Sequence, residues 1–184
     1  AIGTHYLSSI KKLPSLKIII NKKYNESFKK LFSDPYTLKY SKYKNKIKIL
    51  NFDTNSTPRL PFKFISKKLN HSDPSYGFKF FIDKKIISYC TDTKYCENIF
   101  KLSRNSDLLI LECNQMKKKN NFHLSFQEIN KSISRFNSKK IALTHFGPED
   151  FSSIEDRYLK LKKKINLHKN IKILITKDLD CIKL

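Results

Sequence analysis

The chain has 184 residues, which is the usual size of one domain and enough to bury a hydrophobic core. Hydrophobic residues make up 39% of it, with 14 Phe and 9 Tyr, so the composition predicts a folded chain and excludes intrinsic disorder. No stretch approaches the roughly 18 apolar residues of a membrane span, and residues 1–3 do not begin a signal peptide. We therefore expect a single soluble domain over residues 1–184, without membrane contact.

The net charge of +22 arises from 38 Lys and Arg against 16 Asp and Glu. Such a surface attracts RNA or another phosphate-rich ligand, with an affinity that depends on salt and not on sequence. Only four of the 38 are Arg, the residue favoured for specific phosphate contacts, and an excess of Lys, Asn and Ile is also what an AT-rich genome produces. Both explanations of the charge stay open at this point.

The four cysteines, Cys90, Cys96, Cys113 and Cys181, contain no Cys-x-x-Cys pair. They are too sparse to cross-link a small secreted scaffold, and buried cysteines also serve as small hydrophobic residues. We therefore expect reduced thiols and a cytoplasmic protein in a reducing compartment.

Apolar runs of strand length recur along the chain with turn residues between them, at residues 17–20, 47–52, 62–69, 78–82, 85–90, 108–113, 140–143 and 171–175. Helical patterns lie between them at residues 25–32, 97–103, 125–136 and 152–166. This alternation predicts an α/β layered domain. The two-residue connection Asp83-Lys84 predicts an antiparallel hairpin and so a mixed sheet, and Ser125 with Glu128 predicts a capping box at a helix start.

Three metal-competent side chains each follow a predicted strand within a short characteristic phrase. They are His71 in Asn-His-Ser-Asp-Pro-Ser-Tyr-Gly, Asp92 in Tyr-Cys-Thr-Asp-Thr and His145 in Leu-Thr-His-Phe-Gly-Pro. Their order resembles the later metal motifs of the metallo-β-lactamase superfamily. Ser-Asp-Leu-Leu-Ile-Leu-Glu-Cys-Asn at 106–114 and His-Leu-Ser-Phe-Gln-Glu-Ile at 123–129 are similar to its RNase Z and cyclic-phosphodiesterase branch. The resemblance covers about residues 62–184.

This resemblance implies an αββα sandwich of mixed sheets and a metal-dependent hydrolase of phosphodiester bonds. It implies His71, Asp92 and His145 as metal ligands, with Asp92 also catalytic as a bridge between ions. His123 becomes the candidate general acid, and Glu112 a group that orients a ligand His. Zinc or manganese is the implied cofactor, because imidazole and carboxylate groups suit such ions.

The chain departs from this family at its most specific motif, His-x-His-x-Asp-His. In the gapless comparison the four ligand positions are Thr4, Tyr6, Ser8 and Ser9, and a shift by one residue recovers only His5. Hydroxyl groups are poor zinc ligands, so this loss predicts an impaired site with one ion or none rather than two. The motif also falls within the first 14 residues, which predicts a fold truncated at the N-terminus. An exposed sheet edge would then favour a homodimer or a partner chain that covers it.

Three functions stay open on the sequence alone. The first is a family member with a degenerate site and a basic surface that binds nucleic acid or a partner without turnover. The second is an active metal-dependent phosphodiesterase with a reduced ligand set. The third is a structural component of a ribonucleoprotein or protein assembly, since Phe and Tyr alternate with Lys at residues 28–32 and 40–43 and could stack on unpaired bases.

Overall fold

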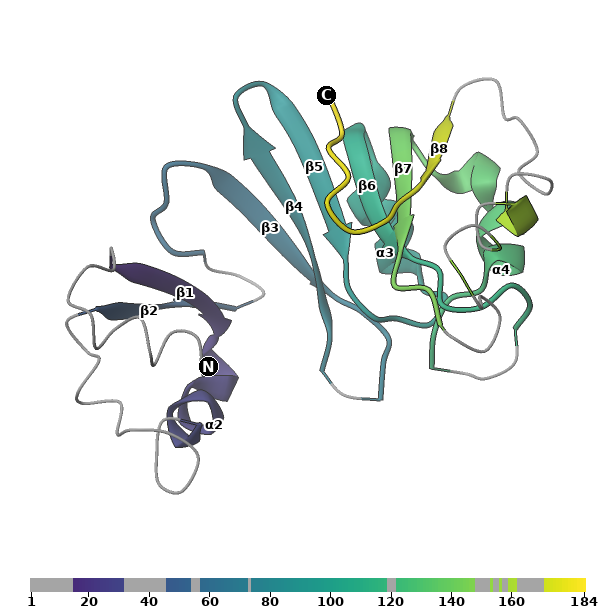
Figure 1. Ribbon diagram of the computed structural model, residues 1–184. Coiled ribbons are helices and arrows are strands. Elements are labelled where there is room, and N and C mark those ends of the chain that lie inside the picture. The colour runs from purple at the N-terminus through teal and green to yellow at the C-terminus, as the bar shows by residue number, and fades with distance from the viewer. Residues whose placement is uncertain are drawn as a thin grey trace. The chain divides into compact units, whose positions relative to one another are not determined.

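The computed structural model describes residues 15–31, 46–53, 57–72, 74–118, 122–147, 153, 156, 159–161 and 171–184. The chain divides into two units, residues 1–60 and residues 61–184, and each is described by itself (Figure 1). That both form one domain over 1–184 stays a prediction. Within the described ranges, no helix is both long enough and apolar enough to cross a membrane.

The first unit pairs two strands in parallel. Its elements are β1 (Leu16–Asn21), the 3-10 helix η1 (Lys22–Tyr24), α2 (Asn25–Lys30) and β2 (Ile47–Phe52). Both strands are rich in Ile, whose branched side chain favours extended backbone, and they pair along their whole length. Asn21 ends β1 because its side chain accepts the backbone N–H of Lys23 and so caps η1.

The second unit is built on a six-stranded mixed sheet with the order β3-β4-β5-β6-β7-β8. Its strands are β3 (Lys63–Lys68), β4 (Tyr76–Ile82), β5 (Lys85–Cys90), β6 (Ser106–Glu112), β7 (Ser138–Thr144) and β8 (Lys172–Ile175). The β4–β5 pair is the predicted antiparallel hairpin, and positive φ angles of 45° and 64° at Asp83 and Lys84 form its tight turn. From β5 to β8 all neighbours are parallel. The predicted α/β architecture with a mixed sheet is confirmed.

Helices cover one face of this sheet. They are α3 (Glu97–Ser103), α4 (Phe126–Lys131) and the 3-10 helix η3 (Ile133–Arg135). In Figure 1 α3 lies behind β6 and β7 and α4 lies at the right of the view, whereas the segment that follows β8 crosses in front of β6 and β7. Ser88 of β5 donates to the Leu102 carbonyl at 2.7 Å, which ties α3 to the sheet, and Leu102, Leu109 and Leu143 are fully buried in the core between them.

The helix predicted over residues 125–136 is in fact two helices. Its start is as predicted, because Ser125 and Glu128 form the reciprocal capping box. At Ser132 the backbone leaves α-helical geometry with φ −104° and ψ 9°. The chain then tightens into η3, and this turn lets Ile133 and Phe136 both enter the core.

Several predictions fall outside the described residues. They concern the degenerate motif at Thr4, Tyr6, Ser8 and Ser9, the His5 that a shifted register recovers, and the aromatic and Lys-rich segment 40–43. The helix predicted over 152–166 is described only in part, with residues 156 and 159–161 helical.

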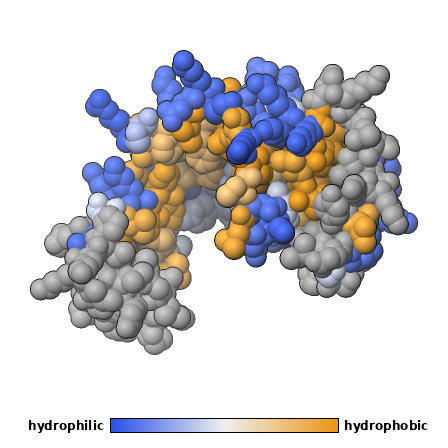
Figure 2. Space-filling model, turned by 45° about the horizontal axis from the view of Figure 1, so that its top comes forward, coloured by the Kyte–Doolittle hydropathy of each residue, from blue (hydrophilic) through white to orange (hydrophobic). Residues whose placement is uncertain are grey.

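Apolar side chains remain at the surface of the second unit. Ile65, Phe81, Ile82 and Tyr89 of the sheet are exposed. Figure 2 shows apolar patches bordered by hydrophilic side chains. The surface seen in this view is therefore a mixture of polar and apolar areas and not a uniformly basic face.

Gly77 permits close packing between β4 and α3. A Cβ atom at this position would lie 2.4 Å from Cδ1 of Leu102 and 3.3 Å from the Tyr89 carbonyl oxygen. Because Leu102 is fully buried, it has no free space to move into. We expect Gly77→Ala to lower the free energy of unfolding by about 1–3 kcal/mol, measured by urea denaturation. An unchanged denaturation midpoint would contradict this close packing.

Candidate metal centre

The ends of four strands bring the predicted site residues together. Strand β3 runs in the same direction as β5, β6 and β7, because two antiparallel pairings separate it from β5. The carboxyl ends of these strands therefore meet at one edge of the sheet, where the loops of such folds place their functional groups. His71 follows β3, Asp92 follows β5, His123 lies between β6 and α4, and His145 follows β7.

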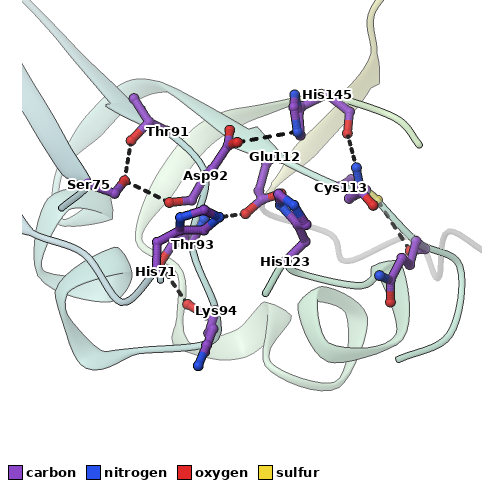
Figure 3. Close-up of polar contacts among 12 residues, drawn as sticks. His71, Ser75, Thr91, Asp92, Thr93, Lys94, Glu112, Cys113, His123 and His145 are labelled. Carbon is purple, nitrogen blue, oxygen red and sulfur yellow. Dashed lines mark hydrogen bonds and ion pairs between the residues drawn. The ribbon is translucent and has the colours of Figure 1, made fainter. Parts of the chain in front are cut away.

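Five side chains with nitrogen or oxygen donor atoms cluster at this edge (Figure 3). The donor atoms of His71, Asp92 and His123 all lie within 4.8 Å of one another. The same holds for Glu112, His123 and His145, so His123 belongs to both groups. We call these five residues the donor cluster.

Two contacts between a His and a carboxyl group link members of the cluster. Nε2 of His145 lies 3.5 Å from Oδ2 of Asp92, and both side chains are nearly half exposed, at 46% and 43%. Nδ1 of His123 lies 2.9 Å from Oε2 of Glu112, whose side chain is only 1% exposed. The ring centroid of His123 is 5.3 Å from that of His71 and 5.4 Å from that of His145. The cluster thus has a buried side at Glu112 and an accessible side at Asp92 and His145.

Glu112 joins three segments of the site. Its Oε1 accepts the backbone N–H of Thr93, its Oε2 pairs with His123, and the backbone N–H of Leu124 also reaches it. Burial raises the pKa of the Glu112 carboxyl to about 8, with a further increase from the charge of Asp92, although the two backbone N–H groups act in the opposite direction.

The protonation of Glu112 determines which nitrogen of His123 carries a proton. A carboxylate at Glu112 accepts the Nδ1–H of His123, which leaves Nε2 with a lone pair. A protonated Glu112 instead donates to Nδ1, and the imidazole proton then stays on Nε2. Only the first arrangement lets Nε2 of His123 act as a ligand or as a base.

In metal-free protein we expect stability to depend on pH through Glu112. Its pKa rises from 4.5 to about 8 on folding, so the folded state retains this proton to higher pH. Its contribution to the free energy of unfolding is full below pH 4.5 and is lost as pH rises through about 8. Urea denaturation of EDTA-treated protein between about pH 5 and about pH 8.5 should show this loss relative to Glu112→Gln, which cannot ionise. A difference between the two proteins that stays constant with pH would contradict it.

The loop with Asp92 is hydrogen-bonded to the connection between β3 and β4. The Ser75 hydroxyl donates to the Asp92 carbonyl at 2.7 Å. The Asn70 N–H donates to Oγ1 of Thr93 at 3.2 Å, and the Lys94 N–H donates to the Asn70 carbonyl at 2.6 Å. Because Asn70 precedes His71, these bonds fix the positions of His71 and Asp92 relative to each other.

His145 has an unusual backbone that its neighbours hold. Its φ of 56° lies in the left-handed region, which is uncommon for a residue other than glycine. The side-chain amide of Asn114 donates to the His145 carbonyl at 3.4 Å, and the Gly147 N–H donates to the Asn114 carbonyl at 2.8 Å. A Cβ atom at Gly147 would lie 2.8 Å from that same carbonyl oxygen, so only glycine fits.

The cluster fits a divalent metal ion by the chemistry of its donors. Three imidazoles and two carboxylates provide the nitrogen and oxygen ligands that zinc and similar ions take, and Asp92 and His145 are nearly half exposed to solvent. All four residues that the sequence predicted, His71, Asp92, His123 and His145, lie in the cluster. Their individual roles as ligand or acid stay predictions.

Sequence reasoning missed the residues that hold the loops in place. Ser75, Thr93 and Asn114 make the bonds described above, and none of them was singled out. For Ser75 and Thr93 a signal was present, because both lie within the phrases that carry His71 and Asp92. Asn114 directly follows the predicted strand 108–113, and its bond to a residue 31 positions later has no local signature.

Comparisons with solved structures place the chain in the metallo-β-lactamase fold. YhfI from Bacillus subtilis is 18% identical with a TM-score of 0.70, over 95% of this chain and 68% of that one. A diphosphatase from the PhnP family is 17% identical with a TM-score of 0.66, over 94% and 61%. Zn²⁺-bound PqqB from Methylobacterium extorquens is 13% identical with a TM-score of 0.61, over 94% and 66%. The chain thus spans between three fifths and seven tenths of the length of these relatives.

No curated protein matches the chain in sequence. The sequence profile of the family described as Anti-Pycsar protein Apyc1 matches residues 13–170, which is most of the chain. The fold, the donor cluster at the sheet edge and this match agree. The chain therefore belongs to the Anti-Pycsar protein Apyc1 family, within the metallo-β-lactamase fold.

Proposed function

We propose that this protein is a metal-dependent phosphodiesterase that hydrolyses a cyclic nucleotide. The observation that carries the proposal is the convergence of five nitrogen and oxygen donors from four separate segments on one edge of the sheet. An isolated His or Asp at a strand end is common, but two groups of three donors within 4.8 Å of one another, joined by a shared His123, form a site.

Each residue of the cluster has a part in this proposal. His71, Asp92 and His123 would hold the ion as one group, and His145 lies beside Asp92 at 3.5 Å as a further ligand. Nε2 of His123 would serve as a ligand with Glu112 ionised, because the carboxylate then accepts Nδ1–H. A divalent ion, when bound, lowers the pKa of a water molecule and offsets the negative charge of a phosphodiester. Asp92 and His145 are exposed enough to meet a substrate, whereas Glu112 keeps its neighbours in position.

The substrate class is supported by three lines of reasoning. The family name, Anti-Pycsar protein, suggests a role against cyclic-nucleotide signalling. A structural relative is named a diphosphatase, so the same fold supports chemistry at phosphorus. A net charge of +22 favours the approach of an anionic substrate.

We propose zinc or manganese as the ion. The donors are imidazole and carboxylate groups without thiolate, which suits both metals. The relative PqqB is described as Zn²⁺-bound. We further propose a reducing, cytoplasmic compartment, since Cys90 and Cys113 are buried in the core as small hydrophobic side chains.

The test combines metal content with turnover. Elemental analysis of the purified chain should find at least one zinc or manganese ion per chain. The metal-loaded protein should hydrolyse a cyclic nucleotide, and EDTA should abolish this activity until metal is restored. Protein that carries metal but leaves cyclic nucleotides and bis(p-nitrophenyl) phosphate intact would overturn the proposed activity.

The second candidate is binding of a nucleotide without turnover. It is favoured by Thr4, Tyr6, Ser8 and Ser9, the hydroxyl-bearing residues that occupy the ligand positions of the family's first motif. Hydroxyls bind zinc poorly, so the cluster would have to hold its ion without ligands from that segment. Cyclic-nucleotide binding with no product after prolonged incubation would favour this candidate.

A further inference from the structure

An aromatic residue and a lysine adjoin members of the donor cluster along the chain. Phe122 precedes His123 in the chain and is 50% exposed. The ammonium group of Lys94 lies 5.8 Å from the centre of the Phe122 ring, within the range of a cation–π contact. Single exposed aromatic residues are common in proteins, but this one is adjacent to a residue that belongs to both donor groups.

The backbones of both residues belong to loops that carry members of the cluster. The backbone of Phe122 is continuous with His123, whose ring is fixed by Glu112. Lys94 lies two residues after Asp92, and its N–H donates to the Asn70 carbonyl at 2.6 Å. The backbone of Phe122 therefore lies next to a member of the cluster, and half of its side chain is exposed.

The ammonium group of Lys94 does not serve the donors themselves. In Figure 3 its side chain points away from Asp92 and His145. Its charge therefore lies outside the cluster, against the Phe122 ring. Lys94 supports the Phe122 ring. An ion or phosphate at the cluster would therefore be held by groups other than Lys94.

We infer that Phe122, supported by Lys94, is the platform on which the base of a nucleotide stacks while its phosphodiester lies at the donor cluster. This inference rests on the proposed function for the place of the phosphodiester. An aromatic face binds any base, because every base has a π face, and stacking covers apolar surface that is otherwise exposed to water. The subsite selects nucleotides over phosphodiesters that lack a base.

The test measures how much the base adds to affinity. Equilibrium dialysis of the intact chain, with and without EDTA, gives dissociation constants for cyclic AMP and for methyl riboside 3′,5′-cyclic phosphate, which is the same cyclic phosphodiester without a base. The wild-type protein should bind cyclic AMP about ten-fold more tightly or better. Phe122→Ala should remove most of this preference and leave the affinity for the base-free cyclic phosphodiester unchanged, whereas Phe122→Tyr should keep the preference.

Phe81→Ala provides the matched control. Phe81 is 39% exposed and lies at the hairpin end of β4, at the opposite end of the strands from the cluster. This variant should bind both ligands as the wild type does. Equal loss of both ligands in Phe122→Ala, with its circular dichroism unchanged, would overturn the inference.

The stacking platform and the proposed hydrolysis can each be contradicted without the other. A base preference that depends on Phe122, in protein that hydrolyses nothing, would support the stacking platform and overturn the proposed hydrolysis. Hydrolysis with no base preference would overturn the platform alone. If neither ligand bound, both the stacking platform and the proposed hydrolysis would be overturned.

Discussion

Replacing Asp92 with Asn is expected to reduce cyclic-nucleotide hydrolysis roughly 10³-fold or more, and to lower the metal content in parallel. The substitution keeps the shape of the side chain but removes a charge that faces Nε2 of His145 at 3.5 Å. A neutral amide oxygen is a weaker ligand for a divalent ion than a carboxylate. Elemental analysis and initial-rate measurements on the same preparation give both quantities.

Asp107→Asn is the matched control for this experiment. Asp107 belongs to β6, near the opposite end of the sheet, where its carboxylate accepts the Ile86 N–H at 2.9 Å and pairs with Lys139. An amide oxygen can still accept the Ile86 N–H. Metal content and rate should therefore match the wild type. If Asp92→Asn also hydrolysed cyclic nucleotide at the wild-type rate, Asp92 would have no part in the reaction.

Glu112→Ala is expected to lower the free energy of unfolding by about 3 kcal/mol and to remove bound metal. The carboxylate is almost completely buried and serves Thr93, His123 and Leu124 together. Truncation leaves their donor groups without a partner and opens a cavity between two loops. Urea denaturation in the presence of EDTA isolates the effect on folding, and elemental analysis reports the metal.

Two further variants test whether Glu112→Ala loses stability because the bonds of Glu112 are lost. Glu97→Ala removes an exposed carboxylate that pairs with Arg135, and it should destabilise the fold far less than Glu112→Ala because solvent screens this pair. Glu112→Gln should fold more stably than Glu112→Ala, since an amide can still accept one backbone N–H. If Glu112→Ala were as stable as Glu97→Ala, Glu112 would not connect the loops as the structure indicates.

Much of the second unit could be predicted from local sequence. Strand β5 and helix α3 have the predicted bounds, because apolar runs of strand length and a helical pattern are short-range properties. The capping box at Ser125 and the turn at Asp83 have the same short range. The end of the α-helix at Ser132 could not be predicted this way, since it depends on how Ile133 packs in the core.

The site, like the fold, has parts that local sequence predicts and parts that it does not. His71, Asp92 and His145 could be found because each lies in a phrase shared with a known family. The bonds that hold them span long sequence separations, such as 31 residues between Asn114 and His145, and so leave no local signal. Glu112 was expected to orient a His, and the structure brings it to 2.9 Å from His123.

The donor cluster draws its members from separate connections between strands, and this arrangement affects how the site can change during evolution. A substitution at His71 or His145 alters one loop and leaves the ladder of the sheet intact, so ligands can be lost one at a time in a chain that still folds. Glu112 is the exception, because one substitution there would disturb two loops and the core together. We therefore expect selection for folding alone to retain Glu112 in relatives that have already lost other ligands.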